Sequence, residues 1–206
     1  MIQPKISLKE PRQLSSEKKA EAILAGGMQE FLAQGYAGTS MDRVARAAGV
    51  SKATVYSHFQ DKEGLFTALI DQLVQGKFRL LFEPSSENLQ PEPRIFLHRL
   101  ADCILDLGVN EPQFINFMRV IIGESGRFPQ LAQAFVQNIE RTSFQVLHQY
   151  LASCPQLKLA DPEATARIFI GALVHFWILQ EMLHGKDIVP MERNRLINNL
   201  IESILR

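Results

Sequence analysis

Apolar residues recur at the three- and four-residue spacing of an α-helix along almost the whole chain. Ser15 or Ser16 is placed to cap a first helix, which the pattern carries to about Gly35. No alternating Val/Ile/Thr stretch bounded by Asn-Gly or Asp-Gly appears, so no strand is predicted. The pattern therefore predicts an all-α protein.

Three further elements follow the first helix. Thr39 or Ser40 opens a short helix that Gly49 ends, and Ser51 caps a second short helix over residues 52–59. Asp61 opens a longer helix, in which apolar pairs recur at four-residue steps as far as Glu83-Pro84. Residues 1–14, with two prolines and four charged side chains, are expected to form a mobile arm.

Residues 84–93, PSSENLQPEP, form the clearest break in the chain. Beyond it the periodicity predicts five helical segments, with Pro112, Pro129, Pro162 and Pro190 at or near four of the starts. These segments are 94–107, 111–123, 129–152, 162–184 and 191–205. We therefore expect a small N-terminal domain, residues 15–66, and a larger helical domain, residues 67–206.

Composition narrows the functional classes only slightly. Twenty-two basic and 22 acidic residues cancel, so the net charge does not indicate a nucleic acid or a membrane surface. The longest apolar run, Phe169 to Leu179, is too short to cross a bilayer, and the first residues lack the apolar centre of a secretory signal. Cys103 and Cys154 show no metal-ligand spacing and are expected to be free thiols. We expect a cytoplasmic protein without a metal site.

Motifs of known catalytic machinery are missing. The five histidines form no HExxH pair, and no GxSxG, P-loop or GxGxxG motif appears. The sequence is therefore not expected to be that of an enzyme, and no cofactor is predicted.

Residues 39–59 carry the informative signal. A short helix, a turn through Gly49 and a second short helix have the spacing of a helix-turn-helix, whose second helix can enter the major groove of DNA. That second helix begins with short or flexible, mostly polar residues, while Val55 and Phe59 are expected to face inward. From spacing alone an ordinary helical hairpin remains an alternative.

The stretch from Gly35 to Ile70, GYAGTSMDRVARAAGVSKATVYSHFQDKEGLFTALI, closely resembles the DNA-binding domain of the tetracycline-repressor-like (TetR/AcrR) family of bacterial regulators. The stretch Glu124 to Ala132 also looks like the C-terminal domain of multidrug-efflux-type members. The resemblance implies an N-terminal three-helix helix-turn-helix domain followed by a larger helical domain for ligand binding and dimerisation.

The resemblance implies that Lys52, Ala53 and Thr54 face bases. Their chemistry agrees, because Lys donates to guanine, Thr offers a hydroxyl and a methyl, and Ala can meet a thymine methyl. Thr39 and Ser40, at a helix start, are expected to contact the phosphate backbone. By the resemblance, Tyr56 and His58 lie at or beside the phosphates, and Lys62 in the first turn of the next helix is expected to face one. The complete predicted DNA-binding set is Thr39, Ser40, Ser51, Lys52, Ala53, Thr54, Tyr56, His58 and Lys62.

The larger domain is expected to bind a small lipophilic effector, as its apolar and aromatic residues allow. A Phe-rich core of any helical domain would show the same residues, so this alternative stays open for each of them. The candidates are Phe78, Phe96, His98, Phe114, Phe117, Met118, Ile121, Phe144, His175 and Trp177. Trp177 is expected to line either the effector site or the dimer seam.

The last two helices are expected to form a homodimer interface, as they do in the resembled family. Periodicity alone also permits packing within one chain. The candidates are Phe169, Leu173, Phe176, Leu196, Ile197, Leu200, Ile201 and Ile204.

These expectations combine into a dimeric DNA-binding transcriptional regulator, a repressor released from a palindromic operator by a small apolar effector. Two alternatives remain at this point. One is an architectural or division-control DNA-binding protein of the same fold. The other is a helical small-molecule-binding module that does not bind DNA.

Overall fold

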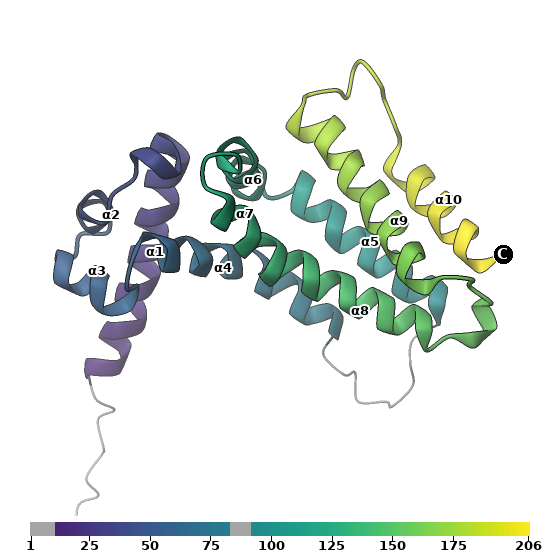
Figure 1. Ribbon diagram of the computed structural model, residues 1–206, viewed down its shortest axis with the longest axis horizontal. Coiled ribbons are helices and arrows are strands. Elements are labelled where there is room, and N and C mark those ends of the chain that lie inside the picture. The colour runs from purple at the N-terminus through teal and green to yellow at the C-terminus, as the bar shows by residue number, and fades with distance from the viewer. Residues whose placement is uncertain (1–10, 83–91) are drawn as a thin grey trace, which may run out of the picture. The chain divides into compact units, whose positions relative to one another are not determined.

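The computed structural model describes residues 11–82 and 92–206, and within these ranges every regular element is a helix. Side chains are described throughout except at positions 11–14, 74–82 and 139–143. The chain divides into two compact units, with the boundary between Leu69 and Ile70 inside helix α4 (Figure 1). Across the described parts of the chain, no helix is long and apolar enough to span a bilayer.

The first unit contains α1 (Pro11–Gly38), α2 (Met41–Ala47), α3 (Lys52–His58) and the start of α4 (Lys62–Phe82). Helix α1 begins at Pro11, before the predicted caps Ser15 and Ser16, and proline suits a first turn because it has no amide hydrogen to leave unpaired. The prediction of a mobile arm is therefore wrong for residues 11–14, and residues 1–10 lie outside the described part of the chain. Its regular part is interrupted at Gly35, whose φ of 67° and ψ of 177° only glycine adopts easily. The interruption confirms the predicted end of this helix.

Aromatic rings build the core of the first unit. The rings of Phe31 and Tyr36 stack with centroids 5.7 Å apart, and Phe66 meets both edge-on at 5.1 and 5.3 Å. Val44 from α2 and Val55 from α3 are fully buried with them. Each short helix is thus anchored by an apolar residue on one face, which leaves its opposite face to the solvent.

The second unit contains the rest of α4 and six further α-helices. These are α5 (Pro93–Val109), α6 (Pro112–Glu124), α7 (Pro129–Phe135), α8 (Arg141–Ala152), α9 (Pro162–Trp177) and α10 (Arg193–Leu205). Of the predicted break at 84–93, residues 84–91 lie outside the described part of the chain, and α5 begins at Pro93.

Two predicted continuous helices are interrupted by π-helical segments. Val136–Glu140 separates α7 from α8, so residues 129–152 are not one α-helix. Ile178–Met182 continues α9 as a second π-helical segment. This segment is capped at Leu183, whereas the predicted helix ran to residue 184. A single π turn shifts the apolar pattern by one position, which periodicity cannot resolve over so few residues.

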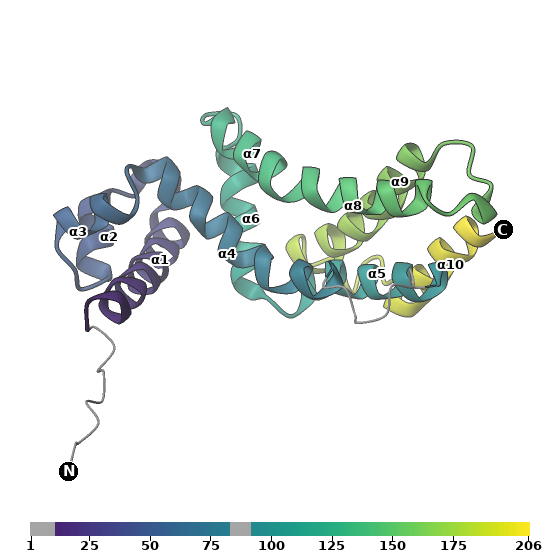
Figure 2. The same cartoon turned by 90° about the horizontal axis from the view of Figure 1, so that it is seen from below.

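Helix α5 lies at the centre of the second unit. It packs against α9 and α10, while α8 covers another side of α9 (Figures 1 and 2). The approach of α5 to α9 is close, because a Cβ at Gly108 would lie 2.5 Å from the Cβ of Trp177. The indole fills the space that a side chain at position 108 would need.

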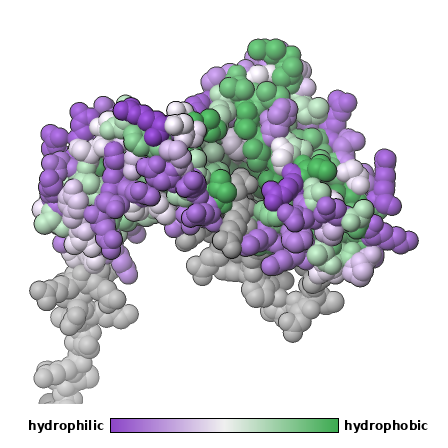
Figure 3. All heavy atoms as spheres, in the orientation of Figure 1, coloured by the Kyte–Doolittle hydropathy of each residue, from purple (hydrophilic) through white to green (hydrophobic). Residues whose placement is uncertain are grey.

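The connection between α9 and α10, residues 183–192, is closed by hydrogen bonds. The buried Gln180 donates its amide to the Val189 carbonyl at 2.9 Å, and the Gly185 amide donates to the Leu179 carbonyl at 2.8 Å. Its apolar side chains nevertheless face solvent, with Ile188 80% exposed and Leu183 62% exposed. Figure 3 shows apolar residues gathered over this connection at the top of the view.

Candidate nucleic-acid interface

The turn between α2 and α3 is built by the residues that the sequence pattern singled out. Ser40 caps α2 by accepting a hydrogen bond from the Arg43 amide, and Ser51 caps α3 by accepting one from the Thr54 amide at 3.1 Å. Gly49 has a φ of 64°, the left-handed conformation that lets the chain leave α2 and enter α3 without strain. The predicted caps and turn of the helix-turn-helix are confirmed.

Helix α3 divides into a buried and an exposed side. Val55 is fully buried, whereas Lys52 and Ala53 are exposed and Tyr56 is 43% exposed. Ser51 is exposed, and Thr54 and His58 are half-buried. The hydroxyls of Ser51 and Thr54 lie 2.8 Å apart and share a hydrogen bond. The helix therefore presents a row of mostly polar groups, held by one apolar anchor.

Lys52, the first residue of α3, is paired with a residue that the sequence reasoning did not select. Its ammonium lies 2.7 Å from the carboxylate of Asp42 on α2 and 5.9 Å from the centre of the Tyr56 ring. The hydrogen bond and the negative charge of Asp42 raise the pKa of Lys52 above its usual value. The exposed side of α3 thus begins with an acid–base pair rather than an isolated cation.

Thr39 and Ser40 differ in their exposure. Thr39 is buried, and its hydroxyl donates to the Gly35 carbonyl at 2.8 Å, so it serves the turn after α1. Ser40 is exposed at the start of α2. Of the two predicted phosphate contacts, only Ser40 has its hydroxyl at the surface.

Lys62 is half-buried and contacts the end of α1. Its ammonium donates to the carbonyls of Tyr36 and Thr39, at 2.7 and 3.1 Å, and lies 4.2 Å from the centre of the Tyr36 ring. Burial, with smaller contributions from Glu63 and Asp61, raises the pKa of Tyr36, so this ring stays neutral beside the cation. A cation in the first turn of α4 thereby finds its negative partners in carbonyl oxygens, without needing a phosphate.

Most of the predicted effector-binding residues are in the core of the second unit. Phe114 meets the ring of Trp177 edge-on with centroids 6.0 Å apart, and the ring of Phe96 stacks on Tyr150 at 3.8 Å. The buried members are Phe96, Phe114, Phe117, Met118, Ile121 and Trp177. Phe144 is half-buried under the Arg167 guanidinium at 4.3 Å, and His175 is exposed. The side chain of Phe78 lies outside the described residues.

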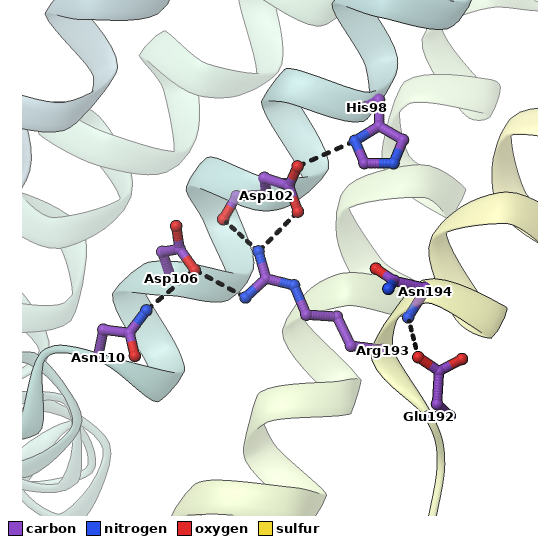
Figure 4. Close-up of polar contacts among 7 residues, drawn as sticks. All are labelled: His98, Asp102, Asp106, Asn110, Glu192, Arg193 and Asn194. Atoms are coloured by element: carbon purple, nitrogen blue, oxygen red, sulfur yellow. Dashed lines mark hydrogen bonds and ion pairs between the residues drawn. The ribbon is translucent and has the colours of Figure 1, made fainter.

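His98, the remaining polar candidate, belongs to a cluster that fastens α10 to α5. Its Nδ1 lies 2.9 Å from a carboxylate oxygen of Asp102 (Figure 4). Arg193, in the first turn of α10, binds Asp102 and Asp106 through two 2.7 Å ion pairs. Arg193 was not predicted as a site residue. The signal that could have revealed it is a cation at a helix start, where acids are usually preferred.

The predicted dimer residues are mostly covered by their own chain. Six of them are buried within one protomer, namely Phe169, Leu173, Phe176, Ile197, Ile201 and Ile204. Leu196 and Leu200 are half-buried. The outward side of α9 instead carries Ile168, which is 68% exposed, with Gly171 and His175.

Comparison with known proteins gives the same picture for both units. Residues 23–69 match the family model described as bacterial regulatory proteins of the tetR family. Residues 96–206 match the model of the C-terminal domain of AefR-like transcriptional repressors.

Individual relatives span nearly the whole chain. The solved structure of the flavonoid-responsive regulator FrrA is 30% identical and superimposes with a TM-score of 0.73 over 92% of this chain and 96% of that chain. The uncharacterized HTH-type transcriptional regulator YhgD of Bacillus subtilis is 27% identical over 85% of this chain and 92% of its own length. The HTH-type transcriptional repressor BepR of Brucella suis is 24% identical over 89% of this chain and 90% of its own.

The matches cover the helix-turn-helix, whose caps, turn and exposed polar face are described above, and the helical unit that follows it. The chain belongs to the TetR family of transcriptional regulators.

Proposed function

We propose that this protein is a homodimeric repressor that binds a palindromic operator through α3 and is released by a small apolar effector bound in the second unit. The observation that carries the DNA-binding part is the two-sided character of α3. Val55 anchors the helix in the core, while Lys52, Ala53 and Tyr56 remain at the surface. These are side chains that can reach base edges and phosphates in a major groove.

A second copy of the chain is proposed to cover the exposed apolar residues of the second unit. Ile168 on α9 and Ile188 in the connection are apolar and largely exposed in one protomer. Figure 3 shows apolar residues gathered over the connection, and exposed apolar patches of this kind mark protein interfaces. Two linked α3 helices then read half-sites separated by about 34–36 Å, one turn of the DNA helix.

The effector is proposed to be a planar, largely apolar aromatic compound that binds beside Phe114 and Trp177. Phe114 on α6 and Trp177 on α9 are buried and meet edge-on, and Trp177 also lies against Gly108 of α5. The flavonoid response in the name of FrrA supports the same chemical class. An effector of this kind releases DNA only if it binds the DNA-incompetent state more tightly than the competent one.

The DNA-binding part is tested by selecting duplexes from a random-sequence pool with the purified protein. We expect enrichment of an inverted repeat, protected from nuclease over two half-sites. Enrichment of no sequence, with weak binding to every duplex, would contradict the proposal.

The effector part is tested by titrating a flavonoid into the protein while recording Trp177 emission and the release of the selected duplex. We expect both signals to saturate over the same concentration range. Linkage also requires that bound duplex weaken flavonoid binding by the same factor. A change in emission that leaves the duplex bound would rule out the coupling.

A further inference from the structure

A carboxylate, that of Asp42, lies beside Lys52 at the start of α3, on the surface that is proposed to bind DNA. Asp42 projects from α2 and binds the Lys52 ammonium at 2.7 Å, with the two side chains 56% and 60% exposed. Arg46, one turn further along α2, donates from its Nε to the backbone carbonyl of Asp42 at 3.4 Å, so this bond does not involve the Asp42 carboxylate. The pair therefore stands in the solvent at the N-terminal end of the exposed side of α3.

Asp42 lies in the first turn of α2, where an acid is favourable next to the helix dipole, and that contribution does not need Lys52. The ion pair itself adds little to stability, because both side chains are exposed to solvent. A carboxylate beside the DNA also repels phosphate and cancels the counterion release that Lys52 would otherwise provide. Asp42 thus lowers general attraction to DNA, and its pairing with Lys52 at the start of α3 is left to serve discrimination between sequences.

We propose that Asp42 is a specificity-determining residue, which holds the Lys52 ammonium and presents an acceptor beside that donor to the bases. In the major groove, guanine offers the O6 and N7 acceptors and its cytosine partner offers the N4 amino donor. Lys52 and Asp42 together complement such a base pair. A site that places an acceptor, such as thymine O4 or a phosphate oxygen, against Asp42 is penalised.

This inference rests on the proposed function, because it requires that α3 read DNA. The test compares wild type with Asp42→Asn, which keeps the shape of the side chain, and Asp42→Ala, which removes it. The probes are a duplex enriched by wild type from the random pool and a scrambled duplex of the same length. Circular dichroism and thermal melting verify that each variant is folded.

We expect both substitutions to lower the ratio of affinities, selected over scrambled duplex, by about ten-fold. The scrambled duplex should bind more tightly than it does to wild type. Its salt dependence should also steepen, by about one unit of slope for each Lys52 released to a phosphate. A purely structural role for Asp42 would weaken both duplexes alike and leave the salt slope unchanged.

The Lys52→Ala background isolates the pair, because Asp42 then has no ammonium to hold. There, Asp42→Asn should lower the affinity ratio by less than it does when Lys52 is present, since the part of the effect that acts through Lys52 is already lost. Glu30→Gln on α1 is the matched control, because it removes one negative charge from the same unit outside this pair, and it should keep the wild-type ratio.

Two results would overturn the inference: an unchanged ratio in both Asp42 variants, or an equal fall with and without Lys52. If wild type enriches no sequence at all, the proposed function fails instead. The two failures are therefore distinguishable.

Discussion

The half-buried Lys62 shows that a residue predicted to contact phosphate can find its partners within its own chain. A basic residue in the first turn of a helix is unfavourable next to the helix dipole, and a phosphate would offset it. Here the carbonyls of Tyr36 and Thr39 offset it, together with the face of the Tyr36 ring. Lys62 therefore ties the start of α4 to the end of α1.

Lys62→Met should destabilise the protein by about 1–3 kcal/mol, because two carbonyls lose their charged donor and the ring loses its cation. Urea unfolding measures this change. Lys18→Met, an exposed lysine on α1, is the control and should leave the midpoint within error. A wild-type midpoint for Lys62→Met would show that the internal contacts contribute little. The phosphate contact implied by the family would then be the better account of this lysine.

The buried Tyr150 should make the free energy of unfolding depend on pH in the alkaline range. Burial, supported by Cys154, raises the pKa of Tyr150 well above its ordinary value. The folded state therefore keeps the phenol proton at a pH where the unfolded chain loses it. Its contribution is fully present below about pH 10, the unfolded pKa, and is lost as pH rises toward the folded pKa.

Tyr150→Phe should reduce the fall in the free energy of unfolding between about pH 9 and about pH 11, because no phenol remains to ionise. Denaturant titrations at several pH values measure the slope. Tyr56→Phe, on an exposed ring, serves as the control and should follow wild type. An identical fall in Tyr150→Phe and wild type would refute the assignment.

Among the elements, α5 and α9 approach each other closely at Gly108. The Cβ that alanine would add at Gly108 meets Trp177 at Cβ and Cγ, 2.5 and 2.6 Å away. These atoms are next to the backbone, so no side-chain rotation relieves the contact and the helices themselves must separate.

Gly108→Ala should therefore destabilise the second unit by about 1–3 kcal/mol or more and shift the emission of Trp177. Gly123→Ala on α6 is the matched control, because nothing lies within 4 Å of its added Cβ. It should instead stabilise its helix by up to about 1 kcal/mol. Equal melting temperatures for the two variants would contradict the packing argument.

Local signals predicted the elements well, and the failures have physical causes. The caps Ser40 and Ser51 and the turn at Gly49 were predictable because each acts on residues within a few positions of itself. The partners of Lys62 are 23 and 26 residues away and come close only in the folded chain. The π turn at Ile178–Met182 leaves no distinct pattern, because it keeps the same apolar composition.

The candidate site shows the same limit at a larger scale. Apolar periodicity identified α9 and α10 as helices with buried faces but could not say what buries them. Ile197 and Ile201 turn out to be buried within their own protomer. Asp42 was not among the predicted site residues, because its contact with Lys52 joins two helices and spacing along the chain does not disclose it.

At the scale of the whole molecule, Ile168 tests the proposed dimer without disturbing the fold. Its side chain is 68% exposed in one protomer, so a carboxylate there is solvated in the monomer. In an apolar interface the same carboxylate would be unpaired and cost several kcal/mol.

Ile168→Glu should thus give a folded monomer with weakened operator binding, as sedimentation equilibrium and duplex titration would reveal. Ile122→Glu, an equivalent change at an exposed position of α6, should remain dimeric. Ile201→Glu is unsuitable for this purpose, since it places the charge in the core. A dimeric Ile168→Glu of wild-type affinity would exclude this face of α9 from the interface.

The closed connection between α9 and α10 has a consequence for proteolysis. Lys186 is exposed there, and exposed loop residues are the usual sites of cleavage. A protease must, however, straighten the segment around the cut, and this segment is held by the Gln180 amide and by an ion pair of 2.8 Å between Lys186 and Glu181. We expect trypsin to cut slowly after Lys186 in wild type and faster in Gln180→Ala, with cleavage after the exposed Lys158 unchanged, as mass spectrometry of timed digests would show. Rapid cutting of wild type at Lys186 would mean that these bonds open often. Slow cutting would make survival of this peptide bond a direct readout of whether the end of α9 is intact.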